Sequence, residues 1–207
     1  MLAPYFINDG LLEAGCDEAG RGALVGGVYA AAVIWDPEIA LPGINDSKQL
    51  TKHQRNKLRT LIEQEAIAWA VGVATQEEID RINILHASFL AMHRAIQALQ
   101  QIPDRLLIDG NRFTPYPSIP HRCIVKGDAT LLPIAAASIL AKTHRDEYMD
   151  RLAIEYPQYG WEHNAGYPTK EHRAAIARYG LTQYHRKSFR CLPEENLFVE
   201  KDSVKGV

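Results

Sequence analysis

Acidic side chains stand at the ends of three apolar runs in this sequence. Asp17 and Glu18 end the first run, Asp109 ends the second, and Asp128 follows the third after a glycine. Burying a carboxylate costs free energy unless a cation or hydrogen-bond donors receive it, and ligands gather at the carboxyl ends of strands in open α/β sheets. We therefore predict that the four acids converge into one divalent-metal site. For any single aspartate, the alternative is an ordinary turn residue that bonds its own backbone.

Length and composition bound the class of protein. The chain has 207 residues, of which 46% are hydrophobic, and this is enough for one substantial core with a small appendage. The formal net charge is −2, so the molecule as a whole is not a basic nucleic-acid binder, although clustered acids would mask a local basic surface. The three cysteines lie far apart without a CxxC pair, which indicates reduced thiols rather than disulfides or a zinc site.

We expect neither a membrane segment nor an export signal in this sequence. Its apolar runs fall short of the ~20 residues that a spanning helix needs, and residues 1–10 lack the basic start and long hydrophobic stretch of a signal peptide. We expect a cytoplasmic protein. Residues 1–192 are expected to form a single domain that includes a C-terminal helical part, and residues 193–207 a polar, flexible tail.

Periodicity and capping signals predict an α/β fold. Capping boxes at Thr51 and Thr75 open two helices, and further helices are expected over 84–101, 132–155 and 169–180, with a polar loop over 159–168. The opening strand should pair as an antiparallel hairpin with a second strand over 25–35, and strands over 67–75, 105–109 and 121–125 follow. The helix before residue 105 lets the fourth strand lie parallel to the first, so that Asp109 comes beside Asp17. The result is a mixed five-stranded sheet flanked by helices on both faces, with a C-terminal helical extension.

A series of blocks, in order along the chain, resembles the signature motifs of the ribonuclease HII family. The match runs from about Glu13 to Phe189, and the ordered set is more specific than any single block. Ribonuclease HIII usually carries an extra N-terminal domain, and only a dozen residues precede the first expected strand here, which favours HII. The blocks are Asp17-Glu18-Ala19-Gly20-Arg21-Gly22, Asp46-Ser47-Lys48, Leu107-Ile108-Asp109-Gly110-Asn111, Lys126-Gly127-Asp128, Ala136-Ala137-Ser138-Ile139-Leu140-Ala141-Lys142, residues 163–172 and His185-Arg186-Lys187-Ser188-Phe189.

The resemblance implies an RNase H-like fold and an endonuclease. It would hydrolyse the RNA strand of RNA/DNA hybrids and nick DNA duplexes 5′ to embedded ribonucleotides, acting as a monomer. Asp17, Glu18, Asp109 and Asp128 would be its catalytic acids and would bind Mg²⁺ or Mn²⁺, two ions with substrate present. Two such ions activate water, neutralise the phosphate and assist the leaving oxygen, which would leave 3′-hydroxyl and 5′-phosphate ends.

Recognition of RNA requires contact with the 2′-hydroxyl. The resemblance assigns this contact to Gly20-Arg21-Gly22, where glycines let the backbone approach a sugar closely. It places Tyr167 against the neighbouring deoxyribose, whereas the residue alone would read as an ordinary loop tyrosine. The same resemblance puts His163 and His172 near the site, and we interpret both as surface histidines.

Basic and hydroxyl side chains are candidates for phosphate contacts. Ser138, Lys142 and Arg145 follow helical spacing on one face, so they could track a nucleic-acid backbone. For Arg145, local pairing with Asp146 or Glu147 is an equal alternative. Further candidates are Lys48, Arg186 and Lys187.

Two other functions share parts of this pattern. A different metal-dependent nuclease of RNase H fold would keep the acids without needing Gly20-Arg21-Gly22 or Tyr167. A non-enzymatic nucleic-acid-binding module would keep the acids only for structure. A small-molecule enzyme is disfavoured, because the sequence has neither a phosphate-cradling glycine loop nor a dinucleotide fingerprint.

Overall fold

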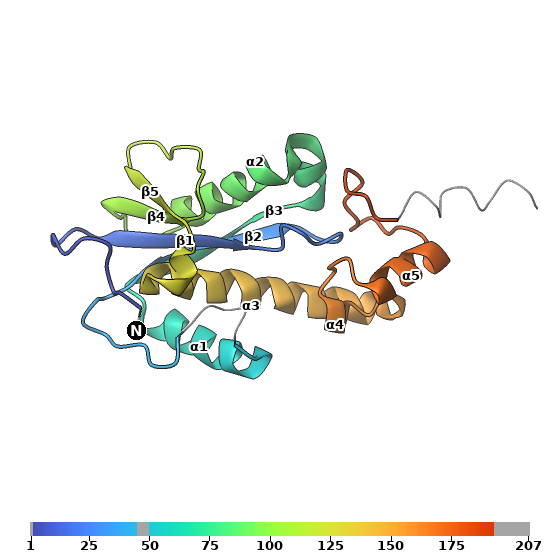
Figure 1. Ribbon diagram of the computed structural model, residues 1–207, viewed down its shortest axis with the longest axis horizontal. Coiled ribbons are helices and arrows are strands. Elements are labelled where there is room, and N and C mark those ends of the chain that lie inside the picture. Colours follow the sequence, from blue (N-terminus) through green and yellow to red (C-terminus); the bar gives the residue numbers. More distant parts are fainter. Residues whose placement is uncertain (1, 45–49, 193–207) are drawn as a thin grey trace, which may run out of the picture.

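The computed structural model describes residues 2–44 and 50–192, which build a five-stranded mixed sheet with helices on both faces (Figure 1). The strand order is β3-β2-β1-β4-β5, so the predicted fold class is confirmed. The strands are β1 (Glu13–Ala19), β2 (Val28–Ile34), β3 (Ala68–Ala74), β4 (Arg105–Asp109) and β5 (His121–Ile124). The helices are α1 (Lys52–Glu65), α2 (Gln76–Gln97), α3 (Leu132–Glu155), α4 (Trp161–Asn164) and α5 (Lys170–Tyr179), with 3₁₀ turns η1 (Gly127–Ala129) and η2 (Pro157–Tyr159).

Strand β1 lies at the centre of the sheet and sets its register. It pairs antiparallel with β2 and parallel with β4, while β2 is antiparallel to β3 and β4 is parallel to β5. The predicted hairpin and crossover are therefore both confirmed. In the β1–β4 ladder Cys16 lies opposite Ile108, so the next residues along the two strands, Asp17 and Asp109, come side by side.

The sheet is buried on both faces, which explains the nearly continuous apolar sequence of β2. Ala30 and Ala32 belong to a core cluster that contains residues of α2, whereas Ala31 and Val33 pack in a second cluster with α1 and α3. Figure 1 shows α2 on one side of the sheet and α1 with α3 on the other. Small alanine side chains in both clusters let the helices approach the strands closely.

Strand β2 begins three residues later than predicted. Residues 24–26 pair instead with the C-terminal part of the chain: the Leu24 amide donates to the carbonyl of Gly166 at 2.8 Å, and the Gly26 amide to that of Tyr184 at 2.9 Å. Because these backbone groups are used elsewhere, the connection between β1 and β2 is a wide loop over residues 20–27 rather than a tight turn.

Helix boundaries follow the local signals closely. Both predicted capping boxes, at Thr51 and Thr75, are present, and α3 spans the predicted residues 132–155. The two segments expected after Thr75 run together as α2, broken at Asn83, where φ is 64°. Helix α2 ends at Gln97, four residues before the predicted end.

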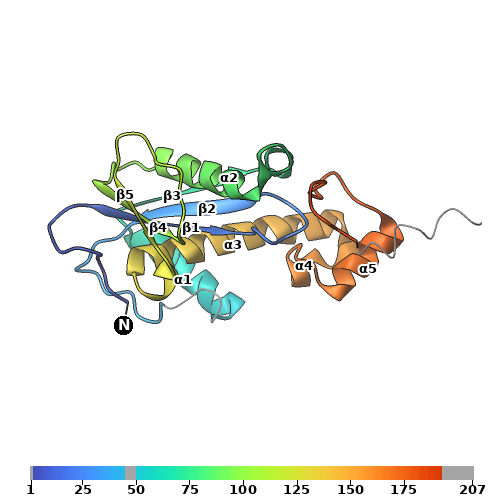
Figure 2. The ribbon, with the colours of Figure 1, turned by 45° about the horizontal axis from the view of Figure 1, so that its top comes forward.

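The C-terminal extension packs against the far end of α3, away from the sheet (Figure 2). Leu152, Trp161 and Ile176 belong to its core cluster, which joins α3, α4 and α5. Part of the predicted polar loop over 159–168 is therefore ordered as η2 and α4. Within residues 2–44 and 50–192, no helix is both long and apolar enough to span a bilayer.

Candidate active site

Asp17 and Asp109 project from the same face of the sheet, towards α3. Alternate side chains of a strand point to opposite faces, and in β4 Leu107 packs against Ile134 of α3 while its neighbours Leu106 and Ile108 pack on the α2 side. Asp109 is two residues after Leu107 and shares its face. Ser138 of α3 donates a side-chain hydrogen bond to Asp17, which places this carboxylate on the α3 side as well.

The side chains of Asp17, Asp109 and Ser138 line a pocket of about 440 Å³. Three of the four predicted acids lie in its wall, together with most of the predicted substrate contacts. The lining residues are Asp17, Glu18, Ala19, Gly20, Arg21, Gly22, Arg55, Asp109, Ser138, Lys142 and Tyr167.

Asp128 is buried in η1 and does not belong to that wall. Its neighbour Gly127 donates its amide to Asp109 Oδ1 at 2.8 Å, so η1 is tied directly to the end of β4. The structure thus brings Asp17, Glu18 and Asp109 together at the pocket, and Asp128 follows the glycine whose amide bonds Asp109.

The charges of the acids repel one another. Burial, together with the charges of Glu18 and Asp109, raises the pKa of the Asp17 carboxyl well above its usual range, and hydrogen bonds from Ser138 and the Glu18 amide offset part of this effect. Among residues 2–44 and 50–192, no three acid, histidine or cysteine side chains close around a common point. The carboxylates of Asp17, Glu18 and Asp109 offer an all-oxygen donor set, which suits a hard divalent cation.

The loop after β1 is held by a buried arginine. Arg186 donates to the carbonyls of Gly20 at 2.8 Å, Arg21 at 2.9 Å and Gly26 at 2.8 Å, and more distantly to Gly27. Gly20 has φ of +96°, and a Cβ there would overlap the Arg145 guanidinium, so only glycine fits. A Cβ on Gly22 would meet no atom within 4 Å, so packing does not require glycine at that position.

Arg186 is therefore not a phosphate contact, and that prediction is wrong. Its side chain is fully buried, and burial together with the charge of Arg145 lowers the pKa of Arg186 to about 9. The side chain still carries its positive charge at neutral pH. The side chain of Lys187 is exposed, and its backbone amide donates a hydrogen bond to the Asp80 carboxylate.

Helix α3 presents two of its three predicted contacts to the pocket. Ser138 and Lys142 line it, whereas Arg145 is fully buried and donates to the carbonyls of Ala165 at 3.0 Å and Val25 at 3.1 Å. The prediction of a surface cation at Arg145 is therefore wrong, because α4 and the loop over residues 20–27 cover this turn of α3. Its guanidinium lies 5.2 Å from the centre of the Tyr167 ring and Lys142 Nζ lies 5.7 Å from it, so both cations position Tyr167 at the pocket edge.

Comparison with known proteins shows the family of the chain. A family model described as Ribonuclease HII matches residues 14–192. The chain belongs to the ribonuclease HII family. The ribonuclease HII of Parabacteroides distasonis is 64% identical over 195 residues, covering 94% of this chain and 98% of the relative. That of Bacteroides thetaiotaomicron is 62% identical over 197 residues, covering 95% and 98%. The chain is accordingly a ribonuclease H, a metal-dependent endonuclease.

Solved structures confirm the RNase H-like fold. Ribonuclease H2 from Pyrococcus horikoshii superposes with a TM-score of 0.72 at 26% identity, covering 86% of this chain and 94% of the other. Bst-RNase HIII in complex with Mn²⁺ superposes with a TM-score of 0.69 at 21% identity, covering 87% and 68%. At this identity the second likeness concerns the fold alone.

His163 and His172, the two histidines of the block over residues 163–172, differ in their environment. His163 has 82% of its side chain exposed, as predicted. His172 is fully buried, which corrects the prediction of a surface histidine: Trp161 Nε1 donates to its Nε2 at 3.0 Å, so its Nδ1 carries the proton and donates to the Tyr167 carbonyl at 2.9 Å. His172 therefore fixes the backbone at Tyr167.

Sequence reasoning missed Arg55 in this ribonuclease HII chain. It comes from α1 and lines the wall of the pocket. The sequence predicts its place on α1, one turn after the Thr51 cap. Nothing in the sequence indicates that α1 packs against α3. The predicted contact Lys48, with the rest of its block, lies outside the described residues.

Proposed function

We propose that this chain cuts the RNA strand of RNA/DNA hybrids and nicks DNA duplexes 5′ to embedded ribonucleotides. The observation that carries the proposal is one pocket that combines three carboxylates with the backbone of Gly20-Arg21-Gly22. In the reaction a water oxygen bonds to phosphorus, the bond to the 3′ oxygen breaks, and that oxygen takes up a proton. The products are a 3′-hydroxyl and a 5′-phosphate.

Asp17, Glu18, Asp109 and Asp128 would hold the divalent ions, two Mg²⁺ or Mn²⁺ with substrate present. Such ions activate water, neutralise the phosphate and stabilise the leaving oxygen. The protein's own part is to fix the acids: Ser138 and the Glu18 amide orient Asp17, and the Gly127 amide orients Asp109. Burial, and then repulsion from Glu18 and Asp109, raises the pKa of Asp17, and a bound cation would offset that repulsion.

The loop after β1 would read the ribose. Packing does not require a glycine at position 22. A backbone left open to contact the 2′-hydroxyl would explain why glycine occupies this position. Arg21 is half exposed and pairs with Glu18 at 3.1 Å, and Tyr167 closes the pocket edge against the deoxyribose. Ser138 and Lys142 would contact phosphates, and Lys48 would add a further cation.

The organisation of the chain is proposed on the same basis. Residues 1–192 act as one catalytic domain, with residues 193–207 as a tail. We also propose a monomer that works in the cytoplasm on hybrids and on DNA that contains ribonucleotides.

The test is a DNA duplex that carries one ribonucleotide, incubated with Mg²⁺, with Mn²⁺ and with chelator. We expect a single nick 5′ to the ribonucleotide with either ion, none with chelator, and none in an all-DNA duplex. Cutting of the all-DNA duplex would favour another nuclease of the same fold. Asp109→Asn should abolish cleavage, whereas Asp104→Asn, an exposed acid just before β4, should not. Binding without cleavage by the wild type would favour a non-enzymatic module.

A further inference from the structure

Helices α1 and α3 bring two cations to one carboxylate behind the pocket wall. Lys142 Nζ lies 2.6 Å from Asp146 Oδ1, and Arg55 Nη2 lies 3.7 Å from Asp146 Oδ2. The side chains of Arg55 and Asp146 are only 14% and 13% exposed. Arg55 and Lys142 line the pocket, and Asp146 does not. The carboxylate therefore holds both cations from behind.

The two cations contact the same carboxylate through different oxygens, Lys142 through Oδ1 and Arg55 through Oδ2. The distance from Arg55 to Asp146 exceeds a hydrogen bond, so charge rather than a directed bond holds the guanidinium on this side. Arg55 Nη1 also donates to the Leu50 carbonyl at 2.5 Å, which fixes the head group to the backbone.

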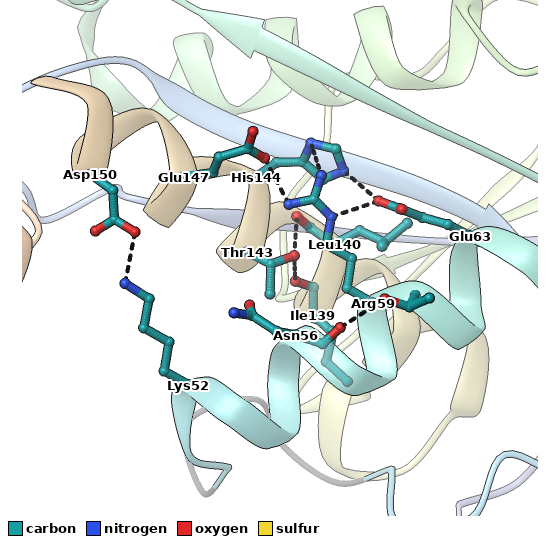
Figure 3. A network of polar contacts seen from close by, with 11 residues as sticks. Lys52, Asn56, Arg59, Glu63, Ile139, Leu140, Thr143, His144, Glu147 and Asp150 are labelled. Atoms are coloured by element: carbon teal, nitrogen blue, oxygen red, sulfur yellow. Dashed lines mark hydrogen bonds and ion pairs between the residues drawn. The ribbon is translucent and has the colours of Figure 1, made fainter.

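The position of α1 is itself secured on the neighbouring surface (Figure 3). Lys52 Nζ pairs with Asp150 at 2.7 Å, and Arg59 Nη1 pairs with Glu147 at 2.8 Å. Lys52 and Arg59 stand about one turn before and after Arg55, on the helix face that meets α3. Lys52 and Asp150 are both exposed, so this pair contributes little by itself, and Arg55 is held by its own contacts to Asp146 and the Leu50 carbonyl.

We propose that Arg55 and Lys142 form a subsite for a backbone phosphate next to the scissile one, and that Asp146 is its positioning residue. The inference rests on the proposed function and deepens it. Guanidinium and ammonium groups are the donors that phosphate oxygens prefer. The three acids of the same pocket would repel an uncompensated phosphate, and the cation pair offsets that repulsion where the strand leaves the metal-binding acids.

Asp146→Asn separates positioning from simple charge. Removing a negative charge beside a phosphate would tighten binding if charge alone mattered, and would lower KM. Loss of positioning has the opposite sign: we expect KM for an RNA/DNA hybrid to rise about tenfold with kcat nearly unchanged, as for a contact made equally in ground and transition states. Asp150→Asn makes the same charge change one turn further along α3, outside the pocket, and should leave KM unchanged. A KM for Asp146→Asn equal to or below the wild-type value overturns the proposal.

A second measurement keeps the inference independent of folding defects. In an Asp109→Asn background with Mg²⁺, hybrid affinity is measured against salt concentration. Arg55→Ala should reduce the slope of log K against log salt by about one, the effect of one lost phosphate contact, and Lys52→Ala should not. An unchanged slope for Arg55→Ala overturns the subsite. If the wild type leaves hybrids intact, the proposed function fails; if it cuts them but Asp146→Asn matches Asp150→Asn, only the subsite does.

Discussion

The guanidinium of Arg186 donates to the carbonyl of Gly20 at 2.8 Å, although 166 positions of sequence separate them. The same side chain also reaches Arg21 and Gly26. The backbone that would read the ribose is therefore shaped by the C-terminal segment, through a buried cation bonded to carbonyl groups. Removing such a donor leaves buried carbonyls without partners, which costs free energy.

Arg186→Lys should weaken this loop without removing the charge. A lysine has a single ammonium and cannot span carbonyls that the planar guanidinium bridges. We expect kcat/KM on the one-ribonucleotide duplex to fall at least tenfold and the free energy of unfolding to fall by about 3 kcal/mol. Arg190→Lys, the same change at an exposed arginine, is the control. Equal activity of the two variants would contradict the role of Arg186.

The two glycines of the loop should respond differently to alanine. Gly20→Ala meets the Arg145 guanidinium at a positive φ, so we expect a loss of unfolding free energy of about 1–3 kcal/mol. Gly22→Ala enters open space and should change stability by less than about 0.5 kcal/mol. If the Gly22 backbone meets the ribose, this stable variant should still lose at least tenfold in kcat/KM. Urea unfolding and nicking assays on both variants measure the contrast; full activity of Gly22→Ala would count against backbone readout.

Asp17→Asn should stabilise the protein in chelator while it abolishes cleavage. The raised pKa of Asp17 means that the folded state holds this proton more tightly than the unfolded state, so stability falls as pH rises above the ordinary value. An asparagine side chain does not ionise, so this loss of stability does not occur in the variant. We expect its free energy of unfolding at pH 7 to exceed that of the wild type by about 1 kcal/mol. Mg²⁺ should stabilise the wild type and leave the variant unchanged. Thermal unfolding with and without Mg²⁺ tests this, and a variant less stable than wild type in chelator would refute it.

Acid should destabilise the C-terminal extension through two buried histidines. Burial lowers the pKa of His172, and it lowers that of His185 to about 4. Because the unfolded state then binds protons first, stability is lost as pH falls below about 6.5, with a slope approaching 1.4 kcal/mol per pH unit from His185 and a contribution of the same sign from His172. Urea unfolding between pH 7 and 5 measures this, in the Asp17→Asn background to remove the opposite titration of that carboxyl. His163→Gln, an exposed site, should keep the slope, and a flat profile would disprove the prediction.

The sequence by itself determined the elements and the placement of the strand-end acids. The capping boxes at Thr51 and Thr75 and the bounds of α3 were readable because they depend on residues a few positions apart. Asp17 and Asp109 were predicted to be neighbours because parallel strands carry their carboxyl ends to one edge of the sheet. Local signals and one topological rule sufficed for these features.

Only the tertiary structure decided which polar side chains face the pocket. Arg145, Arg186 and His172 have the sequence pattern of surface residues, yet all three are buried. Arg145 and Arg186 bond carbonyls of residues 20–27, far away in the chain, and His172 bonds Trp161 and Tyr167. Arg55 and Lys142 meet at Asp146 only because α1 packs on α3. Burial of a charged group depends on which distant carbonyls and carboxylates arrive to receive it, and spacing along a single helix carries no information about those partners.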